Sequence, residues 1–179
     1  MKKLIAAITV SFMMLSLMTG CGTEKSFDGD ILDVISFDMS KTEILENAEK
    51  EFGEIDGMEG RDDESIEDPI DAERILYQLD SLYGYKGEVL LTFDYNLRTL
   101  ERIGIFYLEI EVETAEQQYE KILDQLSNIY GEAYENEYGN YVIGTEECRI
   151  EASMYNYRIE GEEGLYTSID IYIYPKDDN

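Results

Sequence analysis

The chain has 179 residues, of which forty-one are acidic and fourteen are basic, so its formal net charge at pH 7 is −27. A charge of this sign repels nucleic acid, because phosphate binding requires basic residues that displace counterions. The chain contains no histidine and only two cysteines, which excludes Ser/His and Cys/His nucleophilic catalysis and argues against a four-ligand zinc site.

The first twenty residues have the organisation of an export signal. Lys2 and Lys3 form a short basic head, Leu4–Met18 is an apolar run, and Thr19-Gly20 is a pair of small residues directly before Cys21. The run is shorter than the ~20 apolar residues that a membrane-spanning helix needs. An uncleaved anchor helix is the alternative, but such a short segment without a basic stop on its far side anchors poorly.

This stretch resembles the lipobox of bacterial lipoproteins. Cys21 matches the cysteine that the family acylates, and Met18 stands where leucine is most usual. The resemblance implies that residues 1–20 are removed as a signal peptide and that Cys21 carries palmitate-type acyl chains, and two or more such chains give a stable membrane anchor. We therefore expect a lipoprotein on the extracytoplasmic face of the cell membrane, with the lipid bilayer as the partner of acylated Cys21 and residues 21–30 as a short tether.

A single α+β domain is predicted for residues 31–179, and its first clear element is a helix over 41–52. Ser40 and Glu43 have the spacing of a capping box, and Gly53 is a natural helix stop. The rest of this half predicts a strand or lead-in over 31–35, a long acidic loop over 54–72, and strands over 73–82, 89–95 and 100–112. Helical spacing also fits 73–82, and a strand is the preferred interpretation.

A second helix is predicted in the other half of the chain, ending at Tyr130. Thr114 and Gln117 repeat the capping-box spacing, an apolar stripe follows along one side, and Gly131 closes the helix. Strand candidates follow over 138–143, 147–155 and 165–174.

This element order suggests two copies of one unit, in which a helix precedes three antiparallel strands. Phe52-Gly53-Glu54 and Tyr130-Gly131-Glu132 occupy corresponding places at the ends of the two helices. The predicted fold class is α+β with two αβββ-type repeats, over about 38–112 and 113–175, whose helices pack on one face of an antiparallel sheet. In its element order this arrangement resembles the tandem αβ repeats of the β-lactamase-inhibitory-protein family and the single αβ unit of small bacterial envelope lipoproteins.

One face of the predicted sheet is rich in tyrosine. Four tyrosines fall opposite the apolar face of the last two strands: Tyr155, Tyr166, Tyr172 and Tyr174. Tyrosine-rich surfaces flanked by acids suit partners with basic and apolar groups, so these four are the candidate binding surface. The alternative is that they only cover an ordinary sheet face.

The acidic loop suggests a calcium site through Asp62, Asp63 and Asp68, because hard oxygen ligands suit this ion. The order of the acids does not match an EF-hand, and a solvated loop is the preferred interpretation. A pair of carboxylates could serve acid–base hydrolysis, but forty-one acids make close pairs inevitable. Cys148 falls on the apolar face of a predicted strand, where a thiol is normally an inert core residue.

We therefore expect a membrane-anchored, extracytoplasmic lipoprotein that acts as a non-catalytic interaction module for an envelope protein or peptide. A small-ligand or calcium-binding lipoprotein is the alternative, and a carboxylate-based hydrolase comes third. We expect no cofactor, no catalytic residue and no nucleic-acid partner.

Overall fold

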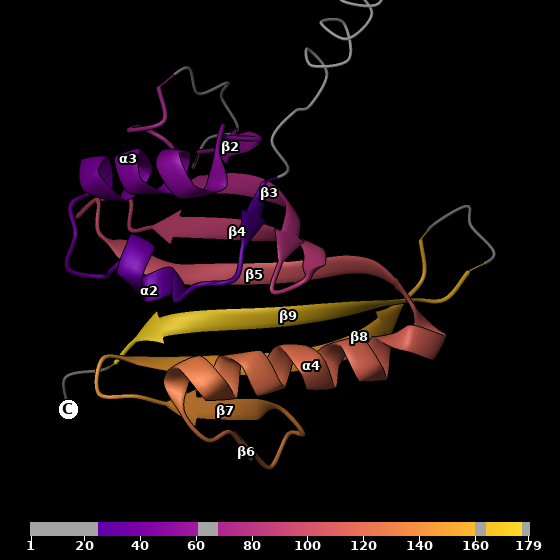
Figure 1. Ribbon diagram of the computed structural model, residues 1–179. Helices are drawn as coiled ribbons and strands as arrows, with labels where there is room; N and C mark the ends of the chain where they lie inside the picture. Colours follow the sequence, from indigo (N-terminus) through magenta and orange to yellow (C-terminus); the bar gives the residue numbers. More distant parts are fainter. Residues whose placement is uncertain (1–24, 61–67, 160–163, 177–179) are drawn as a thin grey trace, which may run out of the picture.

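The computed structural model describes residues 25–60, 68–159 and 164–176, and its strands join in one sheet (Figure 1). The strands are β1 (Ser26–Phe27), β2 (Gly57–Glu59), β3 (Arg74–Leu82), β4 (Tyr85–Phe93), β5 (Leu100–Glu111), β6 (Tyr134–Glu135), β7 (Tyr141–Gly144), β8 (Cys148–Tyr157) and β9 (Tyr166–Pro175). The helices are α2 (Ile31–Val34), α3 (Lys41–Phe52) and α4 (Val112–Tyr130). The strand order is β1-β3-β4-β5-β9-β8-β7-β6, and β2 also pairs with β3.

The helix predicted over 41–52 is confirmed as α3. The Ser40 hydroxyl accepts a hydrogen bond from the Glu43 backbone N–H, and the Glu43 carboxylate accepts one from the Ser40 N–H at 2.9 Å. Both halves of the predicted capping box are therefore present. Gly53 ends the helix with a φ of +86°, a conformation that glycine adopts without the strain of a Cβ.

The second predicted helix is present as α4, but its predicted start is wrong. The N-cap residue is Glu111, which makes no side-chain cap bond, and the helix begins at Val112, directly after β5. Thr114 and Gln117 therefore form no capping box, and the Thr114 hydroxyl instead donates to the Glu111 carbonyl at 3.1 Å. No turn separates the two elements: β5 ends at Glu111 and α4 begins at the next residue.

Several short elements differ from the sequence prediction. Residues 31–35 are not a strand: they contain the single helical turn α2, whose Leu32 N–H donates to the Asp30 carboxylate at 2.8 Å. The loop predicted over 54–72 contains β2, which pairs antiparallel with the start of β3. The strand interpretation of 73–82 is confirmed by β3.

The predicted fold class, with two αβββ-type repeats and helices packed on one face of an antiparallel sheet, is wrong. One mixed sheet of nine strands dominates the described residues, and β1 runs parallel to β3. The helices do not form a common layer, because α2 packs against α3, α3 against β1 and β3, and α4 against β5, β7, β8 and β9. The strands β1, β2 and β6 are only two or three residues long and have no periodicity from which they could be predicted.

The hydrophobic core takes alternate residues of the long strands. In β9, Ile169, Ile171 and Ile173 are fully buried and belong to the same core as Ile122 and Leu126 of α4. Successive side chains of a strand point to opposite faces, so the residues between these isoleucines lie on the other side of the sheet.

Candidate interaction surface

The face of β8 and β9 opposite the core carries all four tyrosines of the predicted surface, and we call it the open face. On β9 it carries Tyr166, Ser168, Asp170, Tyr172 and Tyr174, and on β8 it carries their partners Tyr157, Tyr155, Ser153, Glu151 and Arg149. The structure therefore brings Tyr155, Tyr166, Tyr172 and Tyr174 together on one face. Antiparallel register accounts for this, because directly paired residues share a face.

Tyr172 is the centre of one aromatic group on the open face. The Phe106 ring meets it edge-on, with centroids 5.6 Å apart, and the Tyr174 ring centroid lies 6.1 Å away. The Arg102 guanidinium lies 4.9 Å from the Tyr172 ring centroid, within range of a cation–π contact. Burial, together with the Asp170 carboxylate, raises the pKa of Tyr172 above its ordinary value.

Gly104 makes room for this packing. It stands opposite Tyr172 in the pairing of β5 with β9. A Cβ at Gly104 would come within 2.7 Å of the Phe106 ring. Any larger residue there would push Phe106 aside, so the backbone of β5 shapes this part of the open face.

A second aromatic group consists of Tyr155, Tyr157 and Tyr166. The ring centroids of Tyr155 and Tyr157 are 6.4 Å apart, and those of Tyr157 and Tyr166 are 6.2 Å apart. The Tyr157 hydroxyl accepts a hydrogen bond from the Glu109 N–H at 2.9 Å, which holds the middle ring against β5. Tyr155 is half exposed and offers the most accessible ring of the group.

Asp170 lies between the two aromatic groups. It is only 6% exposed, and its carboxylate accepts hydrogen bonds from the hydroxyls of Tyr155, at 3.2 Å, and of Ser168. Burial of a carboxylate is costly unless hydrogen bonds replace those that it made to water. These two donors supply that replacement, and Asp170 in turn holds the Tyr155 hydroxyl of the second aromatic group.

An open groove of about 700 Å³ lies at the Tyr174 end of the open face. Its charged lining residues are the acidic Asp94, Glu101 and Glu151 and the basic Arg149 and Lys176, and Glu151 forms an ion pair with Arg149. Leu97 also lines the groove and is 73% exposed, so an apolar side chain stands beside acids and an aromatic ring. This combination suits a partner with both basic and apolar side chains.

The described residues give no geometric support to the calcium hypothesis. Asp62 and Asp63 lie outside the described residues, and the Asp68 carboxylate accepts a hydrogen bond from the Ile70 N–H at 3.0 Å. Within the part of the chain that the structure describes, no group of three or more His, Cys, Asp or Glu side chains could hold a metal ion.

Cys148 is buried at the start of β8, as the apolar pattern of that strand predicts. Burial raises the pKa of its thiol above the ordinary value, although the Thr145 hydroxyl beside it acts in the opposite direction. A protonated thiol is a poor nucleophile.

Sequence reasoning missed three contributors to the open face: Arg102, Phe106 and Tyr157. The strand predicted over 147–155 stops two residues short of Tyr157, and one more step of the alternation would have included it. Arg102 and Phe106 come from β5, and only the register between β5 and β9 shows that they meet Tyr172.

No protein family, curated protein or solved structure matches the chain. The resemblance to lipoproteins stays a prediction, since Cys21 lies outside the described residues, and no comparison tests the resemblance in element order to the tandem-repeat inhibitory proteins. None of the described helices is long and apolar enough to cross a membrane.

Proposed function

We propose that the chain is a membrane-anchored, extracytoplasmic lipoprotein that holds a protein or peptide partner on the open face of its sheet, without catalysis. One observation carries the proposal: two aromatic groups flank the buried Asp170 on a face that does not join the hydrophobic core. Tyrosine rings provide large contact areas with few rotatable bonds, and buried tyrosine and arginine side chains dominate binding energy at many interfaces.

Charge favours a basic partner. The whole chain carries a net charge of −27, and this overall charge supports a basic partner, whereas the open face and its groove carry Arg102, Arg149 and Lys176 as well as Asp170, Glu101 and Glu151. Complementary charge speeds association and excludes partners of the same sign. The partner is therefore a polypeptide whose contact surface combines lysine or arginine with apolar side chains.

The anchor would hold the sheet near the bilayer. Residues 22–24 alone separate Cys21 from Lys25, whose backbone N–H donates to the Asp80 carboxylate and whose carbonyl accepts from the Ser81 N–H. A fully extended chain advances about 3.5 Å per residue, so the four steps from Cys21 span about 14 Å at most. An acylated Cys21 would thus hold the captured partner close to the membrane surface.

Cross-linking of the lipoprotein on intact cells, followed by mass spectrometry, tests this proposal. We expect one stoichiometric partner with the wild type and none with the double variant Tyr172→Ala, Tyr174→Ala. The matched control is Tyr134→Ala, Tyr138→Ala, which removes two tyrosines that are 60% and 80% exposed and belong to the β6–β7 segment. Capture that survives the first pair of substitutions, or that is lost equally with the control pair, would refute the proposal.

A further inference from the structure

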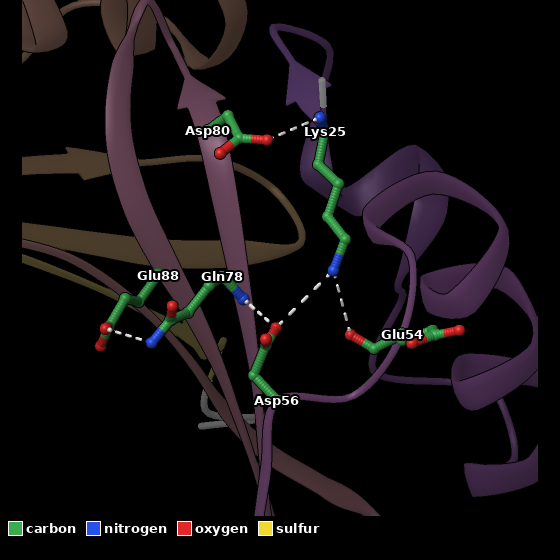
Figure 2. A network of polar contacts seen from close by, with 6 residues as sticks. All are labelled: Lys25, Glu54, Asp56, Gln78, Asp80 and Glu88. Atoms are coloured by element: carbon green, nitrogen blue, oxygen red, sulfur yellow. Dashed lines mark hydrogen bonds and ion pairs between the residues drawn. The ribbon is translucent and has the colours of Figure 1, made fainter. Parts of the chain in front are cut away.

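The two outer edges of the sheet differ. Along the outer side of β3 the backbone is covered by short strands and side-chain hydrogen bonds, and we call this edge closed. β2 pairs with Arg74–Leu76, and β1 pairs with Ser81 and Leu82. Figure 2 shows how the gap between them is bridged: the Asp56 carboxylate accepts the Gln78 N–H at 2.7 Å, and the Asp80 carboxylate accepts the Lys25 N–H at 3.1 Å. The Lys25 ammonium lies 3.8 Å from the Asp56 carboxylate and reinforces this closure.

The edge at β8 is open over half its length. β9 pairs with β8 from Cys148 to Tyr157 without a register shift, whereas β7 pairs only with the four residues Arg149–Ala152 (Figure 1). Among the described residues, no strand pairs with the outer side of Ser153–Tyr157. We call these five residues the free edge.

The hydrogen bonds at the start of β8 show which backbone groups of the free edge point outward. The Cys148 carbonyl accepts from the Thr145 N–H on the β7 side, at 2.9 Å, and the Glu147 carbonyl accepts from the Lys176 N–H beside β9, at 3.1 Å. These directions alternate along a strand, so Met154 and Asn156 present N–H and C=O groups outward. Ala152 has the same orientation, and its carbonyl is already bonded by the Tyr119 hydroxyl at 2.8 Å.

The free edge lacks the features that normally prevent pairing with another chain. Edge strands are commonly protected by charged residues, by proline or by bulges. Ser153–Tyr157 contains no charged residue and no proline, in a chain of which 31% is charged, and its register with β9 is regular. Met154 is 39% and Tyr155 50% exposed, on opposite sides of the strand.

We propose that the free edge of β8 binds an extended, basic segment of a partner polypeptide, which pairs with β8 as a further antiparallel or parallel strand, in line with β7. This inference rests on the proposed function in one respect, that the partner is a polypeptide. Backbone hydrogen bonds to Met154 and Asn156 supply affinity, and Tyr155 places an aromatic ring beside the added strand on the open face. A second copy of this chain fits less well, because pairing would bring together two molecules that each carry a net charge of −27.

The probe is a fluorescent, end-capped peptide of alternating valine and lysine, about eight residues long, which is within the usual range of strand lengths. The protein is the full-length acylated chain in detergent. We expect binding by fluorescence anisotropy and slower amide hydrogen exchange at Met154 and Asn156 when the peptide is present, because their N–H groups point outward. The same peptide N-methylated at two consecutive central residues, which removes one donor from each edge, should bind at least about tenfold more weakly.

Two variants with a matched control test the location. Met154→Pro removes an outward N–H and leaves the bonds to β9 in place, and Met154→Lys adds a charge that opposes a basic strand. Each should weaken peptide binding at least about tenfold, since each removes or opposes one backbone contact. Met58→Lys on β2 is the control, because Met58 is 37% exposed at the opposite edge of the sheet. Met154→Lys preserves the backbone and keeps the test valid if Met154→Pro does not fold.

Three results would overturn the inference. The first is absent binding, or binding that Met154→Lys and Met58→Lys change equally. The second is equal binding of the N-methylated peptide, which would show charge attraction without strand pairing. The third is a dimer that already protects the Met154 and Asn156 amides from exchange without peptide. The variant Tyr172→Ala, Tyr174→Ala separates the two proposals: it should retain the peptide even if it has lost the cellular partner.

Discussion

Replacing Lys41 with methionine should change how the stability of the fold depends on pH. Lys41 is the first residue of α3 and is only 5% exposed. Its ammonium donates to the Ala72 carbonyl and lies 4.4 Å from the centroid of the Phe93 ring. Burial, and then the nearby positive charge of Arg98, lower the pKa of Lys41 from the ordinary value of 10.5 to about 8.

The direction of the effect follows from proton linkage. Between pH 8 and pH 10.5 the unfolded chain holds a proton on Lys41 that the folded chain has released, so stability rises with pH in that window. One pKa unit corresponds to about 1.4 kcal/mol, so Lys41 should contribute a rise on the order of 2 kcal/mol in the free energy of unfolding between pH 7 and pH 10. Lys41→Met has no such group and should lose this rise.

Urea unfolding followed by circular dichroism at pH 7, 8, 9 and 10 measures this difference. The matched control is Lys50→Met, because the Lys50 side chain lies on the same helix and is 78% exposed. The scan stops at pH 10 because burial raises the pKa of Tyr77 to about 12, and a raised tyrosine pKa removes stability as pH rises above its unfolded value. If Lys41→Met and Lys50→Met show the same pH dependence, the reasoning about Lys41 is wrong.

Three further substitutions test how the fold is held together, each by urea unfolding. Ser40→Ala removes the cap of α3 and should lower the free energy of unfolding by about 1 kcal/mol; no change would show that the capping box contributes nothing. Asp56→Ala should lower the free energy of unfolding by about 1 kcal/mol and speed hydrogen exchange of the Gln78 amide. If that exchange stayed slow, the Asp56 carboxylate would not be closing this edge. Ile171→Ala should cost about 3 kcal/mol by opening a core cavity, and a loss under 1 kcal/mol would place Ile171 outside the core.

Local sequence patterns predict the long helices and strands, because the spacing of apolar, capping and glycine residues is repeated or marked within each of them. Alternation located β3, β4, β8 and β9, and the Ser40–Glu43 spacing with Gly53 located α3. At the end of β5 the sequence alternates Leu108, Ile110 and Val112 with glutamates, a pattern that by itself predicts one buried face, and the structure departs from it. The register with β9 shifts between Tyr107 and Ile110, and Glu109 has a φ of +56°, so Leu108 is exposed instead of buried. Such an irregularity depends on the neighbouring strand and leaves no mark on the hydrophobic pattern.

The sequence predicts which residues of one strand lie on the candidate surface, but it does not predict which residues of neighbouring strands meet there. The alternation of β9 placed Tyr172 and Tyr174 opposite the core, because a period of two fixes the face of each residue. The contacts of Tyr172 with Phe106 and Arg102 depend on pairing between β5 and β9, which the hydrophobic pattern does not specify. The free edge follows from the lengths of β7 and β8 and from their register, which only the assembled sheet shows.

The most direct test of the central claim is the affinity of the captured partner for purified variants, measured by isothermal titration calorimetry. We predict that Tyr172→Ala, Tyr174→Ala raises Kd by at least about thirtyfold, since a buried tyrosine at the centre of an interface contributes about 2 kcal/mol or more. The variant should keep a wild-type circular dichroism spectrum, and Tyr134→Ala, Tyr138→Ala should bind as the wild type does. An unchanged Kd for the folded Tyr172→Ala, Tyr174→Ala variant would contradict the assignment of the open face as the binding surface.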